Sequence, residues 1–260
     1  MKLPIKQIAT VISLLALSTH LQAAAASVPT DLATVAAPGS TVLAVLENME
    51  YLRGFKGTDF SFDSEVITLE NEKVVGKHKL DVKISEQGYA LIEVLSPKTE
   101  QGRRTLIRDK DLWLYLPGSS NVVRIAPLQR VFGSASIADV LNTSYLNGYT
   151  VVTSEQTSDG KQLDVSLVSN NAKATFAKIE LKYDLEHDRP IETRHFTVSG
   201  RLLKTIQYKS FIDHQGKAKL EKIAIYDSLR KNSAVWIRMS DYQTSSYPET
   251  TFSKSGLRKN

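Results

Sequence analysis

From residue 58 onward, apolar and polar residues alternate along one short segment after another, and turn residues separate the segments. In residues 178–184, Ile179, Leu181 and Tyr183 alternate with lysine and glutamate, and residues 162–169 repeat the pattern. A period of two is typical of a strand with one buried and one solvated face. Because short turns join about eleven such segments, the sequence predicts one large antiparallel β meander. A sheet this wide curls, and its apolar concave face requires a cover.

The segment 111–125, DLWLYLPGSSNVVRI, departs from this alternation because it is apolar at nearly every position. A strand over 112–117 would place three leucines on one face and Trp113 and Tyr115 on the other. Both faces of this strand therefore need a cover. We expect helices over one face, and either the C-terminal segment 245–257 or a protein partner over the other. We interpret the aromatic pair as inward-facing, because large rings often line ligand sites.

Two segments are predicted to form helices on the concave face. Residues 41–53 carry apolar residues at helical spacing behind Ser40, a typical capping residue. A shorter helix is expected over 136–143, capped by Ser136, within a segment (127–148) that we predict to be a mobile lid. Two alternatives follow. The helices fill the concavity as an ordinary core, or they cover it incompletely and leave an apolar cavity for a ligand.

The first 26 residues have the layout of a secretory signal peptide, with two lysines, a short apolar run and a cluster of alanines. The sequence thus predicts a signal peptide over 1–26, a flexible leader over 27–39 and a single domain over 40–260. The apolar run is too short to span a bilayer, and we expect no stable membrane insertion. The chain has no cysteine, which excludes disulfides, thiolate metal sites and a lipid-modified cysteine anchor. These features predict a periplasmic protein.

The sequence offers little support for catalysis or for nucleic-acid binding. The net charge is +5, but the basic residues alternate with apolar ones along strands and form no stripe with stacking aromatics. His78, His187, His195 and His214 show no metal-ligand spacing, and no nucleophile elbow or phosphate-binding loop occurs. The charged stretch 186–190, EHDRP, is interpreted as a solvated turn. We expect a protein that is not an enzyme and that has no metal, no cofactor and no nucleic-acid partner.

Residues 95–125, LSPKTEQGRRTLIRDKDLWLYLPGSSNVVRI, followed by GSASIADVLNTSY, resemble the outer membrane lipoprotein-sorting protein family, the LolA-like periplasmic carriers. Later strands continue the likeness in the same order, over roughly residues 41–257. The resemblance implies an incomplete antiparallel β-barrel, with helices closing its open side and an apolar cavity for acyl chains. The resemblance implies no catalytic residues. The likeness is to the broader group, some of whose members are associated with RND-type transporters, rather than to the dedicated lipoprotein carrier.

We therefore predict a periplasmic carrier that binds a lipid or a lipoprotein acyl chain and hands it on. The implied partners are this cargo, an RND-type transporter or exporter in the inner membrane, and an acceptor in the outer membrane. The alternative is a periplasmic sensor or docking module that binds a transporter or another protein through the same fold.

The candidate cavity residues lie on the first helix, on the strands and on the lid. They are Val45, Leu46, Met49 and Leu52; Leu91, Leu106, Trp113 and Tyr115; and Ile137, Val140 and Leu141. Arg103 and Arg104 stand on opposite faces of a strand, so one of them should point toward the apolar side. We expect them at the cavity mouth, where an arginine could hold the lid or contact a lipid headgroup.

Overall fold

The computed structural model describes most of the chain after residue 38. The described residues are 39–52, 57–109, 111–119, 121–125, 130–132, 135–136, 144–171, 174, 176–230 and 232–258. The predicted signal peptide, nearly all of the predicted leader and the predicted lid residues Ile137, Val140 and Leu141 lie outside them. Residues 36–260 form one compact unit.

The described part of the chain contains two α-helices, two short 3-10 helices and fifteen strands. The helices are α1 (Ser40–Leu52), α3 (Tyr145–Gly148), η1 (Glu249–Phe252) and η2 (Gly256–Arg258). The strands are β1 (Phe60–Glu70), β2 (Lys73–Ile84), β3 (Ala90–Ser96), β4 (Arg104–Arg108), β5 (Asp111–Tyr115), β6 (Val122–Ile125), β7 (Arg130–Phe132), β8 (Ala135–Ser136), β9 (Tyr149–Gln156), β10 (Gln162–Ser169), β11 (Lys178–Asp184), β12 (Arg189–Phe196), β13 (Leu202–His214), β14 (Lys217–Asp227) and β15 (Ser233–Thr244).

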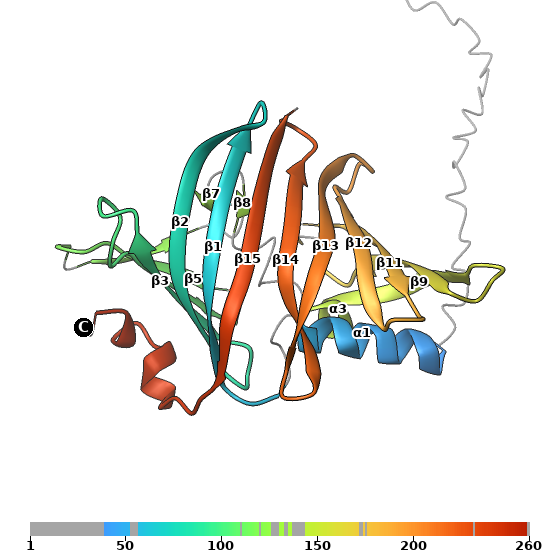
Figure 1. Ribbon diagram of the computed structural model, residues 1–260, viewed down its shortest axis with the longest axis horizontal. Coiled ribbons are helices and arrows are strands. Elements are labelled where there is room, and N and C mark those ends of the chain that lie inside the picture. The colour runs from blue at the N-terminus through green and yellow to red at the C-terminus, as the bar shows by residue number, and fades with distance from the viewer. Residues whose placement is uncertain are drawn as a thin grey trace, which may run out of the picture. The chain divides into compact units, whose positions relative to one another are not determined.

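Thirteen of these strands form one antiparallel sheet, which is open and not closed into a barrel. Their order is β6-β5-β4-β3-β2-β1-β15-β14-β13-β12-β11-β10-β9, so β1 and β15 join the two halves of the meander. Figure 1 shows these long central strands side by side. The predicted incomplete antiparallel barrel is confirmed, with thirteen strands in the sheet instead of about eleven. The edge strands β6 and β9 flank the segment that contains the predicted lid.

The predicted lid differs from expectation at its start. Ser136, expected to cap a helix, lies in β8, which pairs with β7 in a separate two-stranded sheet. At the other end of the segment, α3 is a single helical turn, and the Ser144 side chain accepts a hydrogen bond from the Asn147 amide. The rest of the predicted helix lies outside the described residues.

Helix α1 forms where it was predicted. Both its apolar and its polar side chains hold it against the rest of the fold. Val42, Val45, Leu46 and Met49 are buried on one stripe, as the helical spacing requires. Asn48 Nδ2 donates to the Tyr183 hydroxyl at 2.6 Å and to the Asp188 carbonyl at 3.0 Å. The buried carboxylate of Glu50 accepts hydrogen bonds from the Tyr145 and Leu146 amides, which ties α1 to α3.

Candidate ligand-binding face of the sheet

The sheet has an inner face, which carries α1 and two large apolar clusters, and an outer face on the opposite side. The first inner cluster, here called the helix cluster, joins α1 to β10 and β11. The second, here called the open cluster because α1 covers little of it, consists of buried side chains of β1–β6 and β13–β15. Of the described helices, only α1 contributes to the open cluster, through its last residue Leu52. The inner face is therefore apolar over a wider area than α1 covers.

The helix cluster is covered by α1. Val45, Leu46 and Met49 are buried against Leu167, Ile179 and other strand residues. Burial of this kind stabilises α1 on the sheet and leaves these side chains little access to a ligand. Of the four predicted cavity residues on the helix, only Leu52 lies in the open cluster.

The open cluster has an accessible margin next to the edge of the sheet. Leu114 on β5 is partly buried and stands directly opposite Val123 on β6, whose exposed fraction is 50%. Directly paired residues share a face, so both side chains are on the inner side. Phe60 and Phe211 are further partly buried side chains of the same cluster. An apolar chain could reach the inner face at these points.

Strand β5 presents the opposite face from the one expected. Leu112 is fully buried in the open cluster, whereas Trp113 and Tyr115 belong to a third cluster that also contains Leu91 and Leu106. Because neighbouring residues on a strand alternate in direction, this third cluster lies on the outer face. The interpretation of the aromatic pair as inward-facing was wrong, and none of these four predicted cavity residues is on the face that carries α1.

The C-terminal segment covers the outer face of β3–β5, which is one of the two covers that the sequence suggested. Phe252 and Leu257 pack on Leu106 and its neighbours, and the Lys254 ammonium lies 3.3 Å from the centre of the Trp113 ring. A Cβ atom at Gly256 would lie 2.5 Å from two backbone carbonyl oxygens. Only glycine allows so tight a turn of this segment.

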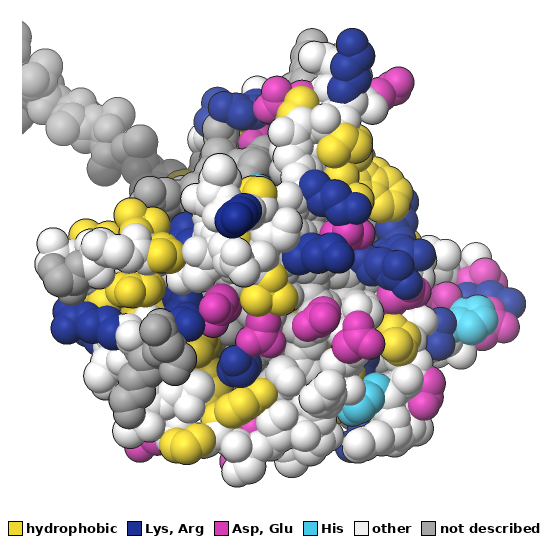
Figure 2. Space-filling view, turned by 60° about the vertical axis from the view of Figure 1, so that its left-hand side comes forward, with side chains coloured by type: hydrophobic (Ala, Val, Ile, Leu, Met, Phe, Trp, Pro, Cys, Tyr) yellow, Lys and Arg dark blue, Asp and Glu magenta, His cyan; other side chains and the backbone are white. Residues whose placement is uncertain are grey.

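The two predicted mouth arginines serve other contacts. Arg104 lies on the outer face, where it forms an ion pair with Glu93 at 2.8 Å and donates to the Leu257 carbonyl at 3.4 Å. Arg103 forms an ion pair with Glu100 at 2.5 Å. The placement of Arg104 at a cavity mouth is thus corrected, because its strand register turns it toward the C-terminal segment. On the side of the molecule shown in Figure 2, basic and acidic side chains are interspersed, with hydrophobic ones among them.

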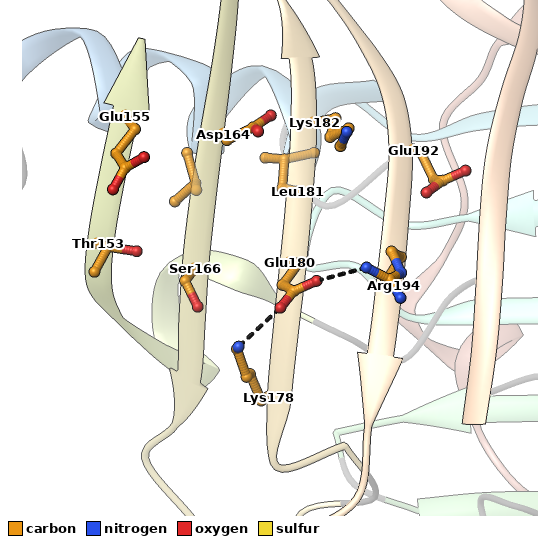
Figure 3. Close-up of a pocket in the computed structure, with 11 residues that line it drawn as sticks. Thr153, Glu155, Asp164, Ser166, Lys178, Glu180, Leu181, Lys182, Glu192 and Arg194 are labelled. Carbon is orange, nitrogen blue, oxygen red and sulfur yellow. Dashed lines mark hydrogen bonds and ion pairs between the residues drawn. The ribbon is translucent and has the colours of Figure 1, made fainter. Parts of the chain in front are cut away.

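A polar hollow of about 230 Å³ lies on the outer face of β9–β12. Figure 3 shows that acidic and basic side chains line it and that α1 lies behind the sheet. Glu180 accepts from Lys178 at 2.8 Å and from Arg194 at 3.2 Å, so these charges neutralise one another at a solvated surface. This arrangement is typical of a wet sheet face.

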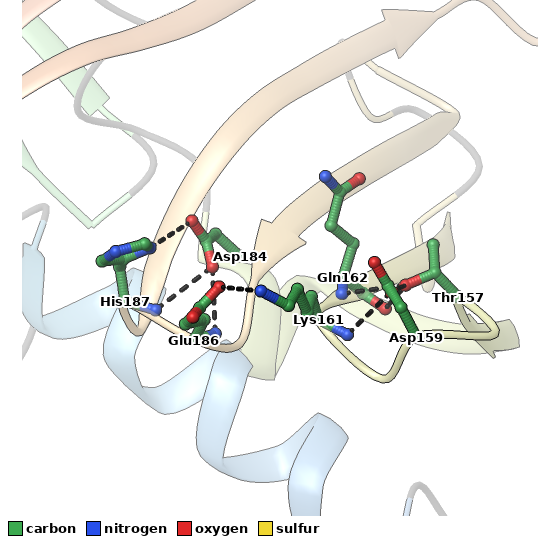
Figure 4. Close-up of polar contacts among 7 residues, drawn as sticks. All are labelled: Thr157, Asp159, Lys161, Gln162, Asp184, Glu186 and His187. Atoms are coloured by element: carbon green, nitrogen blue, oxygen red, sulfur yellow. Dashed lines mark hydrogen bonds and ion pairs between the residues drawn. The ribbon is translucent and has the colours of Figure 1, made fainter.

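The charged stretch 186–190 begins in the turn between β11 and β12, as the sequence predicted. In Figure 4 the Asp184 carboxylate accepts from the His187 ring at 2.8 Å and from two turn amides. The His187 side chain lowers the pKa of Asp184. Lys161 pairs with Glu186 at 2.9 Å and joins this turn to the neighbouring hairpin. These contacts stabilise a turn and leave no acid–base pair facing a cleft.

A second hollow, of about 290 Å³, lies between the end of α1 and the turn of the β13–β14 hairpin. We call it the basic hollow, because its described lining includes three basic side chains and no Asp or Glu. The side chains that define it are Tyr51, Phe60, His214, Lys217, Lys219 and Tyr242. Sequence reasoning missed this site, since its residues come from five elements and carry no motif.

No described helix is long and apolar enough to cross a membrane. Within the described residues, no cluster of three or more His, Cys, Asp or Glu side chains could hold a metal ion. The histidines instead have local roles: the ring of His195, for example, packs against Phe176 and contacts the Thr193 hydroxyl at 3.0 Å.

Comparison with known proteins identifies the family. A family model described as "-like: Uncharacterized protein" matches residues 86–259, about two thirds of the chain. A LolA superfamily protein from Nitrosomonas europaea has the same fold, with a TM-score of 0.70 and 21% identity over 82% of this chain and 98% of that one. The chain belongs to the family that this model describes, and it has the fold of the LolA superfamily protein.

Two further solved structures are equally similar to this chain. An outer membrane lipoprotein-sorting protein domain from Vibrio parahaemolyticus has a TM-score of 0.69 and 20% identity, over 83% of this chain and 98% of that one. A DUF1329 family protein from Desulfovibrio piger has a TM-score of 0.69 and 16% identity, over 82% and 96%. None of the curated proteins matches the sequence. At these identities the solved structures establish the fold.

Proposed function

We propose that the protein is a periplasmic carrier that binds an acyl chain of a lipid or a lipoprotein on the inner face of the sheet and hands it on. The observation that carries this proposal is the open cluster, an apolar inner cluster to which α1 contributes only Leu52 and which has partly buried side chains such as Leu114 at its margin. Its accessible margin at Leu114 and Val123 lies beside the edge of the open sheet. The signal-peptide layout of residues 1–26 supports the periplasm as its location.

The energetics fit a carrier that works by relative affinity. Burial of an acyl chain of about sixteen carbons is worth roughly 12 kcal/mol at about 0.8 kcal/mol per methylene, before ordering costs. This is enough to hold a lipid in water. Release then requires that an acceptor or a displaced cover offsets part of the burial, and segment 127–148 is the proposed lid. No covalent step and no cofactor are needed.

The proposal is tested by placing polar side chains at the accessible margin. We expect a double variant, Leu114→Gln with Val123→Gln, to weaken binding of a fluorescent fatty acid about tenfold, because the acyl chain would meet two amides. Fluorescence titration measures the affinity, and circular dichroism checks the sheet. The matched control is Val168→Gln on β10, an exposed valine that alternates with the inward-facing Leu167.

Equal affinity of the double variant and the wild type would contradict an acyl site at this margin. If the wild-type protein takes up no fatty acid and a protein partner co-purifies with it, the docking module becomes the better account. That alternative has no observation of its own in the described structure.

A further inference from the structure

Lys219 is a buried cation with no anionic partner among the described residues. Its exposed fraction is 7%, and its ammonium lies 3.8 Å from the centre of the Tyr51 ring and 4.9 Å from that of Phe60. No ion pair joins it to any Asp or Glu in the described part of the chain. The faces of aromatic rings compensate a desolvated charge only in part.

The hairpin turn directs further positive charge to the same place. Gln215 and Gly216 have φ angles of +55° and +75°, which is the left-handed conformation of a two-residue hairpin turn. This turn sets His214 directly opposite Lys217 on the two strands. The Lys217 ammonium lies 5.5 Å from the centre of the Tyr51 ring, on the same ring that contacts Lys219.

The basic hollow adjoins the proposed acyl-binding surface. Two of its aromatic residues, Phe60 and Tyr242, are also members of the open cluster, and their ring centres are 6.2 Å apart. Positive charge and apolar side chains therefore meet at these two rings. A ligand that satisfies both is an amphiphile with an anionic head.

We propose that the basic hollow binds the phosphate of an anionic phospholipid whose acyl chains lie on the open cluster. This proposal rests on the proposed acyl-carrier function and names the class of cargo. The phosphate would supply the counter-charge that Lys219 lacks, with Lys217 and His214 as further donors. The hollow, at about 290 Å³, has room for a phosphate group and its first ester-linked atoms.

The test compares two fluorescent lipids with identical acyl chains, phosphatidylglycerol and neutral diacylglycerol. We expect the wild-type protein to bind phosphatidylglycerol about tenfold more tightly than diacylglycerol, because one desolvated charge-assisted hydrogen bond contributes about that much affinity. Lys219→Met should remove this preference and leave diacylglycerol binding unchanged. Lys217→Gln, at an exposed lining position, should reduce the preference in part. The matched control is Lys209→Met, an exposed lysine outside the hollow that donates to Gln207.

The outcomes separate this proposal from the function on which it rests. Equal binding of both lipids by the wild type would overturn the phosphate site and leave the acyl carrier standing. Inorganic phosphate that competes with phosphatidylglycerol at equal concentration would assign the hollow to free phosphate and overturn the lipid headgroup. Absence of binding of either lipid would overturn the acyl carrier, and the phosphate site with it.

Discussion

Lys219 illustrates at the residue scale how a functional position can oppose stability. Burial, together with the smaller effect of the positive charge of Lys217, lowers the pKa of this lysine to about 8. The unfolded chain therefore holds more protons than the folded one between pH 8 and the ordinary lysine pKa of 10.5, and the free energy of unfolding rises with pH across that window. Below pH 8 the full cost of burying the charge is present. A lone buried cation kept at this cost points to a ligand.

Replacing this lysine should make the protein more stable. We expect Lys219→Met to raise the free energy of unfolding at pH 7 by about 1–2 kcal/mol after allowance for solvent screening, and to abolish the rise between pH 8 and 10.5. Urea denaturation at pH 7 and pH 10 measures both effects, with Lys209→Met as the control. A variant that is less stable at pH 7 would show that Lys219 has a stabilising partner, and the argument from its isolation would fail.

The sequence does not single out Lys219 because alternation predicts it to be an ordinary solvated lysine of a strand. Its burial arises where α1, β1 and β14 converge, and these segments are far apart in the chain. The one local signal is HQGKAK, which places His214, Lys217 and Lys219 around a glycine turn.

At the scale of elements, β5 shows what an apolar sequence pattern predicts about a strand and what it does not. An apolar residue at every position predicts a strand covered on both sides, and the structure confirms this with the open cluster on one side and the C-terminal segment on the other. The pattern does not say which side is inner, because Leu112 and Trp113 both face apolar neighbours, Ile107 and Leu106. That choice depends on where α1 and the C-terminal segment pack.

The C-terminal segment should stabilise the sheet through Phe252. This ring is 2% exposed and packs edge-to-face on Tyr247 at 5.8 Å, so Phe252→Ala should lower the free energy of unfolding by about 3 kcal/mol. In a Trp236→Phe background, the fluorescence of Trp113, then the only tryptophan, should shift to longer wavelength as its cover loosens. The control is Val198→Ala at an exposed turn. Unchanged emission would show that Phe252 does not shield this face.

At the scale of the whole molecule, the prediction of fold class was successful because it depends on a repeated signal. Many alternating segments with short turns favour one antiparallel meander, and the resemblance around residues 95–125 indicated the LolA-like family. The pairing of β1 with β15 carries no local signal, and neither does the division of the inner face into the helix cluster and the open cluster. Both follow from how the two halves of the meander meet.

A carrier must hold a lipid on the inner face, and native mass spectrometry measures this most directly. The protein would be purified from the periplasm of a producing bacterium without detergent, and its bound molecules would be extracted and identified. We predict a second mass species that exceeds the mature chain by the mass of one phospholipid or one lipoprotein. A single species at the mass of the chain alone, with no lipid in the extract, would contradict the central claim.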